Sequence, residues 1–260
     1  MISVCSLFLL TFVRQMQFFK SVFGFIFAIL AGLLIIISLI IVTPIYAIIL
    51  RFGGVNAVQI ANKLSKIWAH YVLFCSGARL KVFGKDLIRP KETYVFVSNH
   101  RSYLDIPVCA IATDNTFKFL AKDELGKAPF LGYIIRTLYI TVKRQSVRDR
   151  VMSLKKMESE LKQGVSVFLY PEGSRNKTNE LLTEFLDGAF TVAINTGTPI
   201  AVCTIYDTRK ILQPGNLFKL IPGKVNAWWE QPIETKGMTK KDIPALKEKV
   251  RGLMEKRIQG

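Results

Sequence analysis

The chain has 260 residues, of which 50% are hydrophobic, and it carries a formal net charge of +17. A charge of this sign and size implies a polyanionic partner, which could be nucleic acid, anionic lipid headgroups or a phosphorylated substrate. The lysines and arginines are dispersed and form no recognisable nucleic-acid-binding module. We therefore expect no nucleic-acid partner, and the apolar N-terminus favours an anionic bilayer surface.

The four cysteines predict neither a disulfide framework nor a metal site. Cys5, Cys75, Cys109 and Cys203 are widely spaced and form no CxxC pair. The chain has only two histidines, so a zinc site is not expected. We interpret the cysteines as reduced thiols in a cytosolic setting.

Residues 1–54 are predicted to be a hydrophobic membrane-anchoring segment. Residues 21–50 contain no charged side chain. One straight helix of this length would span about 45 Å, more than the roughly 30 Å of a hydrocarbon core. Gly32 and Pro44 are candidate break points. Two arrangements therefore remain open, a tilted span with an interfacial extension and a re-entrant pair of helices.

Charge on either side of this segment indicates its orientation. Two basic residues, Arg14 and Lys20, precede the apolar run, and more follow it: Arg51, Lys63, Lys66, Arg79, Lys81 and Lys85. By the positive-inside tendency, we expect an inner or cytoplasmic membrane location with the following domain facing the cytoplasm. Basic residues on both flanks also leave a monotopic hairpin open as an alternative.

Residues 55–78 are predicted to be a connector that contains an amphipathic helix. His70 lies on this helix without a nearby acid, and we interpret it as a packing or interfacial residue.

Residues 79–260 are predicted to form an α/β domain. Strands are expected at residues 79–84, 94–98, 117–121, 138–142, 165–170, 199–205 and 225–231. Helices are expected at residues 106–112, 147–162, 185–195 and 243–257. Strands that alternate with helices favour an α/β fold, with a mixed sheet flanked by helices.

A histidine and an aspartate follow the apolar strand at residues 94–98. His100 comes directly after Asn99, and Asp105 lies five positions further on. The strand fixes the backbone, while this spacing lets Asp105 fold back toward the imidazole ring. A carboxylate on one ring nitrogen sets the tautomer and leaves the other nitrogen able to accept a proton. The pair is therefore a candidate general base.

Two other strand ends carry basic residues, Lys143-Arg144 and the run Pro171-Glu172-Gly173-Ser174-Arg175. Ligands of open α/β sheets gather outside the carboxyl ends of the strands, and arginine suits phosphate because its planar fork donates two parallel hydrogen bonds. The chain has no GxSxG, Walker or GxGxxG motif, so serine hydrolase, nucleotidase and dinucleotide-binding functions lose their usual support. What remains is general-base chemistry beside a phosphate-binding cluster at a membrane.

Together these residues resemble the 1-acylglycerol-3-phosphate acyltransferases, a group of the glycerolipid acyltransferases. The family motif NHxxxxD matches residues 99–105, and the motif KxELxxxPxxG matches residues 122–132. A strand that ends in arginine matches at Arg144, and the motif FPEGTR stands here as Tyr-Pro-Glu-Gly-Ser-Arg at residues 170–175. The fourth motif is only partial at residues 198–202, where Cys203 replaces its second proline, so its residues stay unassigned.

The resemblance implies transfer of a fatty acyl group from an acyl-CoA or acyl-carrier-protein thioester to the sn-2 hydroxyl of lysophosphatidic acid, which yields phosphatidic acid. His100 and Asp105 are then the catalytic base and its orienting partner. The implied phosphate-binding residues are Arg144, Glu172, Gly173 and Arg175, with Glu172 orienting an arginine. The implied oxyanion or supporting residues are Asn99, Lys122 and Ser174. A thioester is already activated, so neither a metal nor a cofactor is expected.

Two alternatives stay open. Related enzymes acylate other acceptors, namely glycerol-3-phosphate, lysophospholipids or ornithine lipids. A membrane-tethered protein that binds anionic lipid without turnover would use the basic surface but would leave the His–Asp pair unexplained. Release of free thiol from a thioester separates this binding function from either enzyme.

Overall fold

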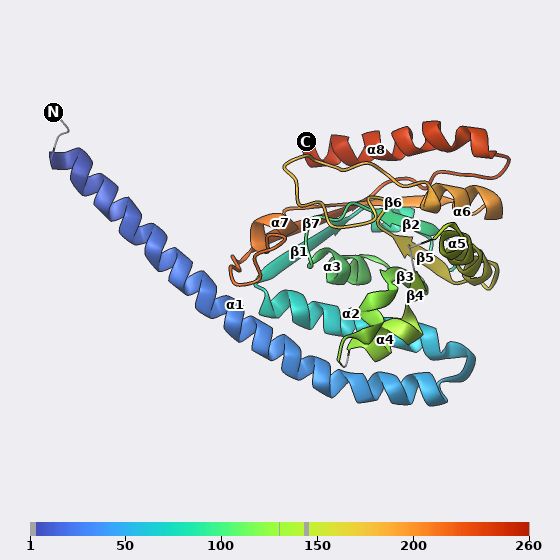
Figure 1. The fold of residues 1–260 in the computed structure, drawn as a ribbon, viewed down its shortest axis with the longest axis horizontal. Coiled ribbons are helices and arrows are strands. Elements are labelled where there is room, and N and C mark those ends of the chain that lie inside the picture. The colour runs from blue at the N-terminus through green and yellow to red at the C-terminus, as the bar shows by residue number, and fades with distance from the viewer. Residues whose placement is uncertain (1–3, 130, 143–145, 260) are drawn as a thin grey trace.

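The computed structural model describes residues 4–129, 131–142 and 146–259. A long N-terminal helix leads into an α/β domain in which helices cover a central sheet (Figure 1). The helices are α1 (Val4–Phe52), α2 (Ala57–Cys75), α3 (Asp105–Ala112), α4 (Leu131–Leu138), α5 (Val147–Lys162), α6 (Gly188–Thr196), α7 (Thr208–Ile211) and α8 (Ile243–Gln259). The strands are β1 (Ala78–Phe83), β2 (Val95–Ser98), β3 (Phe117–Lys122), β4 (Ile140–Val142), β5 (Ser166–Leu169), β6 (Ile200–Tyr206) and β7 (Gly223–Trp229). Short 3-10 helices lie at Gly54–Asn56, Lys85–Leu87, Asp123–Lys127 and Lys240–Asp242.

The sheet has the strand order β1-β7-β6-β2-β5-β3-β4. Neighbouring strands are parallel throughout, except that β6 and β7 are antiparallel. The predicted mixed sheet flanked by helices is therefore confirmed. Strand β2 lies in the middle, between β5 and β6, so the residues that follow it emerge at the centre of the carboxyl edge.

The central strands are buried on both faces, as expected for parallel strands covered by helices. Side chains alternate along β2, so that Phe96 belongs to the core beneath α2 and α3, while Val95 and Val97 belong to the core beneath α5, α6 and α8. Figure 1 shows these two helical layers on opposite sides of the sheet. The backbone of β2 is therefore held rigidly where it leads into the motif at residues 99–105.

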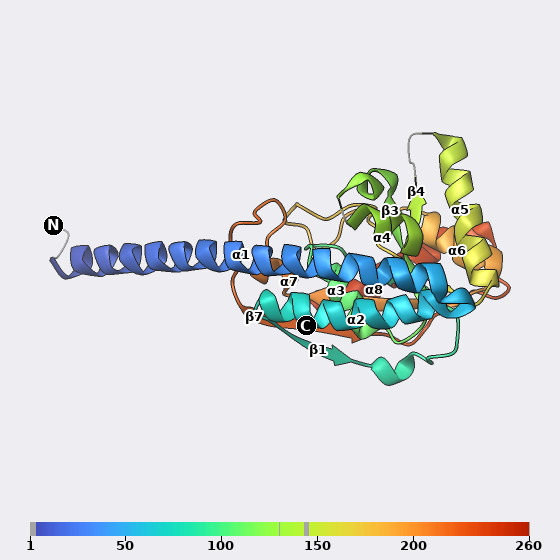
Figure 2. The ribbon, with the colours of Figure 1, turned by 90° about the horizontal axis from the view of Figure 1, so that it is seen from below.

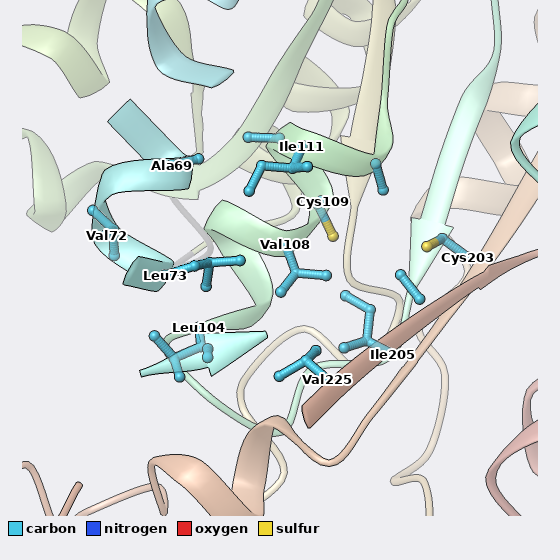
Figure 3. Packing of buried hydrophobic residues seen from close by; sticks show 14 of the residues in the cluster. Ala69, Val72, Leu73, Leu104, Val108, Cys109, Ile111, Cys203, Ile205 and Val225 are labelled. Carbon is cyan, nitrogen blue, oxygen red and sulfur yellow. The ribbon is translucent and has the colours of Figure 1, made fainter. Parts of the chain in front are cut away.

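Figure 3 shows how the first of these cores is packed. Leu73 of α2, Val108 of α3 and Ile205 of β6 meet between the helices and the sheet. Val108 is fully buried, and Leu73 and Ile205 are nearly so. Helix α3 begins at Asp105, so this packing fixes the start of the helix and with it the carboxylate of Asp105.

Helix α1 runs for 49 residues without interruption through both expected break points, Gly32 and Pro44. Pro44 removes one backbone donor, and the Thr43 hydroxyl donates to the Leu39 carbonyl at 2.7 Å in the same turn. The chain therefore does not turn back within residues 21–50. It turns back after Phe52, and the second half of α1 lies beside α2 (Figure 2).

Polar contacts fasten α1 to α2. The Tyr46 and Ser65 hydroxyls lie 2.7 Å apart, and the Trp68 indole N–H donates to the Ser38 hydroxyl at 3.0 Å. Within the described residues, Ser21–Phe52 is the one helical segment long and apolar enough to cross a membrane, and little of it is buried. Large apolar side chains are exposed along it, including Phe23, Ile26, Leu30, Leu33, Ile37, Ile41 and Ile48. This surface indicates membrane association.

The structure differs from the sequence-based elements mainly around residue 138. A strand was expected at residues 138–142, but Leu138 ends helix α4 and only residues 140–142 form β4. Ile134 and Leu138 of α4 pack against the second half of α1. The start of the run at residues 138–142 is helical because one face of α4 packs against α1. The sequence did not reveal this, because periodicity cannot distinguish a helix from a strand in so short an apolar run.

Candidate active site

Asn99 extends the contact between β2 and β6 after the backbone ladder has ended. Its side-chain amide donates to the Ile205 carbonyl at 2.6 Å, and its side-chain oxygen accepts the Ile205 N–H at 2.8 Å. Asn99 is almost fully buried. Because its amide and its oxygen are both bonded to one backbone residue, Asn99 fixes the loop from which His100 projects.

His100 and Asp105 are in direct contact. His100 Nδ1 lies 2.9 Å from Asp105 Oδ2, and the two side chains are 12% and 1% exposed. The same oxygen accepts the backbone N–H groups of Arg101 and Ser102 at 2.6 and 2.7 Å. A carboxylate oxygen accepts hydrogen bonds, so its contact with the ring places the imidazole proton on Nδ1. Nε2 is then the nitrogen able to accept a proton.

Asp105 has a further partner from a distant part of the sequence. The Thr208 hydroxyl, in α7, donates to Asp105 Oδ1 at 2.7 Å, and both residues are 1% exposed. Asp207, directly before α7, adopts a left-handed conformation with φ of 74°. The Ser102 hydroxyl donates to the Leu212 carbonyl at 2.8 Å and fastens the loop to the other end of α7. Sequence reasoning missed Thr208, because no motif marks it.

Glu172 holds the backbone of the histidine. Its Oε1 accepts the His100 N–H at 2.8 Å, and its Oε2 accepts both the N–H and the hydroxyl of Thr183 at 2.9 Å. The His100 carbonyl accepts the Asn176 N–H at 2.7 Å. The loop after β5 therefore clamps both peptide groups of His100. Glu172 was expected among the phosphate-binding residues, and the structure places its carboxylate against the backbone of His100, on the loop after β2.

Tyr170 supports the imidazole from one side. The two rings stack with their centres 4.0 Å apart and an angle of 16° between them. The Tyr170 hydroxyl donates to Cys109 Sγ at 3.5 Å. Burial raises the pKa of Tyr170 well above its usual 10.0, so the phenol stays neutral and offers an apolar face to the ring. Tyr170 belongs to the sequence motif at residues 170–175. Its stacking on His100 could not be predicted from that motif, because the contact requires β2 and β5 to be neighbours.

Arg175 and Gly173 lie on the same loop as Glu172. The Arg175 guanidinium carbon lies 3.3 Å from the centre of the Tyr103 ring, a cation–π contact. Gly173 has φ of 71°, a conformation that favours glycine. Ser174 is exposed beside it.

Of the other predicted residues, Lys122 lies further from the imidazole. Lys122 is exposed at the end of β3, which is separated from β2 by β5, so its backbone lies two strand spacings away, about 10 Å. Arg144 lies outside the described residues. Among the residues that are described, no group of three or more His, Cys, Asp or Glu side chains could hold a metal ion.

This arrangement is suited to the activation of a hydroxyl by general-base catalysis. A histidine with one nitrogen bonded to a buried carboxylate can remove a proton through its other nitrogen. Residues 79–206 match the family model described as Acyltransferase. This region of the chain is therefore similar to the acyltransferase family.

Curated relatives carry a more specific name. The chain is 29% identical over 212 residues to a chloroplastic 1-acyl-sn-glycerol-3-phosphate acyltransferase of Brassica napus, covering 81% of this chain and 60% of the relative. It is 33% identical over 172 residues to a chloroplastic enzyme of the same name from Arabidopsis thaliana, covering 65% and 48%. The alpha form from Mus musculus is 29% identical over 195 residues, covering 74% and 68%. The chain thus spans only about half to two thirds of these relatives.

A solved structure shares the fold. The crystal structure of the 1-acyl-sn-glycerophosphate acyltransferase from Thermotoga maritima aligns with a TM-score of 0.80 and 21% identity, covering 92% of this chain and 96% of that chain. Since 92% of this chain is covered, the alignment includes at least part of the long N-terminal helix as well as the sheet.

Proposed function

We propose that this protein transfers a fatty acyl group from a thioester of coenzyme A or acyl-carrier protein to the sn-2 hydroxyl of lysophosphatidic acid, giving phosphatidic acid. The contact between His100 and Asp105 carries the proposal, because it provides a base for a hydroxyl that is not itself acidic. The names of the relatives support the choice of acceptor.

The reaction is a direct acyl transfer. His100 Nε2 accepts the hydroxyl proton as the acceptor oxygen attacks the thioester carbonyl. The tetrahedral intermediate collapses, the carbon–sulfur bond breaks, and the imidazolium returns its proton to the leaving sulfur. A positioned base contributes about 10²–10⁴-fold, so donors to the oxyanion must supply much of the remaining acceleration. Lys122 and the backbone amides of the surrounding loops are the oxyanion candidates.

We assign the acceptor phosphate to Arg175 and Arg144, with Gly173 allowing close approach of the backbone. Arg175 is favoured because its guanidinium lies on Tyr103, on the loop that also carries His100. Glu172 acts by holding the His100 backbone and the arginine-bearing loop. Acyl transfer through these residues requires neither a metal nor a cofactor.

Helix α1 would bring this site to the bilayer that contains the acceptor. Its exposed apolar side chains are suited to hydrocarbon, where each gains about 1.5–3 kcal/mol relative to water. Basic residues that follow the apolar run, such as Arg51 and Lys63, favour a cytoplasmic location for the domain. Protease digestion of sealed inside-out membrane vesicles tests this orientation, because the domain should be cleaved there and protected in right-side-out vesicles.

An acceptor panel tests the function. Purified protein in detergent receives palmitoyl-CoA with lysophosphatidic acid, glycerol-3-phosphate, lysophosphatidylcholine or a lyso-ornithine lipid, and the products are measured by mass spectrometry. We expect phosphatidic acid to form at least about tenfold faster than any other product. Preference for another acceptor would overturn the assignment of lysophosphatidic acid. The panel is repeated with a palmitoyl thioester of acyl-carrier protein. Absence of thiol release with every acceptor and from both thioesters would overturn the enzymatic function.

A further inference from the structure

Two arginines outside the residues assigned so far lie beside the catalytic loop. Arg101 directly follows His100, and Arg209 follows Thr208, so each is the chain neighbour of a residue that bonds Asp105. Both side chains are half-buried. The Arg101 Nε is buried and has no hydrogen-bond partner among the described residues. A buried donor without a partner is uncommon and calls for a ligand or water.

Hydrogen bonds bring the two arginines to the same carboxylate, because the Arg101 backbone N–H donates to Asp105 Oδ2 and the Thr208 hydroxyl, next to Arg209, donates to Asp105 Oδ1. Burial lowers the pKa of Arg101 below its usual value, and the positive charge of Arg209 lowers it further, while Glu172 and Asp105 act in the opposite direction. The carboxylates of Glu172 and Asp105 already accept hydrogen bonds from the protein at all four oxygens. Among the described residues, neither carboxylate forms an ion pair with Arg101 or Arg209.

Arg175 adds a third positive charge to the same loop region. Its Nε is also buried without a partner among the described residues, and its guanidinium stacks on Tyr103, two residues after Arg101. Arg209 Nη1 donates to the Thr178 carbonyl, on the segment that follows Arg175. The three arginines therefore come from the loops after β2 and β5 and from α7, and the contacts of Arg175 with Tyr103 and of Arg209 with Thr178 link these three segments.

We infer that Arg101 and Arg209 complete, with Arg175, a subsite for a phosphomonoester dianion beside His100. Grouped guanidinium groups without carboxylate partners repel one another, and a dianion offsets this repulsion while it accepts their hydrogen bonds. The inference rests on the proposed function, because the ligand is taken to be a phosphate of a substrate. That phosphate belongs either to the acceptor lipid or to coenzyme A.

The first test measures anion binding without turnover, so it does not depend on the proposed reaction. The variants are Arg101→Gln and Arg209→Gln, and the matched control is Lys210→Gln, which removes the same charge from the next residue, whose side chain is 82% exposed. Inorganic phosphate should raise the melting temperature of the wild type and of the control. The apparent Kd for phosphate should weaken by about 10- to 100-fold in each arginine variant, as expected for loss of a hydrogen bond to a charged group.

The second test identifies the source of the phosphate through steady-state kinetics of the same variants. A rise of at least about tenfold in the KM for lysophosphatidic acid, with the KM for palmitoyl-CoA within twofold, assigns the subsite to the acceptor. The reverse pattern assigns it to coenzyme A, and an acyl-carrier-protein donor would then serve as a further check, since it lacks the 3′-phosphate.

A change of less than about twofold in both the phosphate Kd and the two KM values would overturn the inference. The variants Arg101→Lys and Arg209→Lys keep the charge and control for local unfolding. They should recover part of the phosphate binding, and no recovery in spite of wild-type melting temperatures would also count against a phosphate subsite.

Discussion

The Thr208 hydroxyl and the Asp105 carboxylate form a 2.7 Å hydrogen bond, on the opposite oxygen from the one that contacts His100. Asp105 is thus held from two sides, by its own loop and by α7, and its orientation fixes the imidazole. Thr208 is almost fully buried, so it acts through Asp105. It is a positioning residue.

Thr208→Val should lower kcat without weakening acceptor binding. The change removes one hydrogen bond to a buried charge, which costs about 1.5–3 kcal/mol, so we expect kcat to fall roughly 10- to 100-fold. Thr208→Ser keeps the hydroxyl and should restore activity to within about threefold of the wild type. Steady-state kinetics with lysophosphatidic acid decides the matter. If valine and serine variants behaved alike, the role would be one of packing only.

His100→Ala should remove nearly all turnover, because no other base among the described residues contacts Asp105. We expect a loss of at least about 10²-fold, measured as thiol release from palmitoyl-CoA. His70 provides a matched control, since it is the other histidine of the chain and is exposed on α2. His70→Ala should retain wild-type rates. An His100→Ala variant within tenfold of the wild type would show that the base is elsewhere.

Glu172→Gln separates a backbone-holding role from a phosphate-binding role. The glutamine amide would face donors, the His100 N–H or the Thr183 N–H and hydroxyl, so the loop should shift and kcat should fall about tenfold. The KM for lysophosphatidic acid should stay within about twofold. Glu180→Gln, on the same loop and exposed, serves as the control. A raised KM with an unchanged kcat would instead place Glu172 at the acceptor phosphate.

The sequence predicts the local part of this site and not the part that depends on strand order. His100 and Asp105 are five residues apart on one loop, so their contact could be predicted from the spacing alone. The contact of Glu172 with His100 spans 72 residues, and that of Thr208 with Asp105 spans 103. Both require β2 to lie between β5 and β6, which alternation of helices and strands does not determine.

The same limit applies to the fold. A mixed α/β sheet followed from the alternation of apolar strands with amphipathic helices, and β2 and β5 were recognisable because strands buried on both faces are continuously apolar. Helix α4 was missed at Leu138, because its apolar side faces α1, an element almost a hundred residues earlier that the local pattern does not contain. The short α7 has four residues and no periodicity from which to predict it.

The buried thiols of Cys109 and Cys203 make the stability of the fold depend on pH. Burial raises the pKa of Cys109 and Cys203 above the usual 9.0, because a thiolate loses its hydration in the core. Folding therefore favours the protonated thiols. Their contribution to stability is fully present below pH 9.0, the pKa in the unfolded chain, and is lost as the pH rises toward the higher folded pKa.

We therefore expect the free energy of unfolding to fall as the pH is raised from 8 to 10, by up to about 1.4 kcal/mol per thiol for each pH unit above the unfolded pKa. Urea denaturation at fixed ionic strength measures this slope. Cys203→Ala should have lower stability throughout but a shallower decline, because it has lost one titrating group. Native-state alkylation with iodoacetamide gives an independent check: Cys109 and Cys203 should react only after unfolding, and rapid labelling of either in the folded protein would contradict the raised pKa.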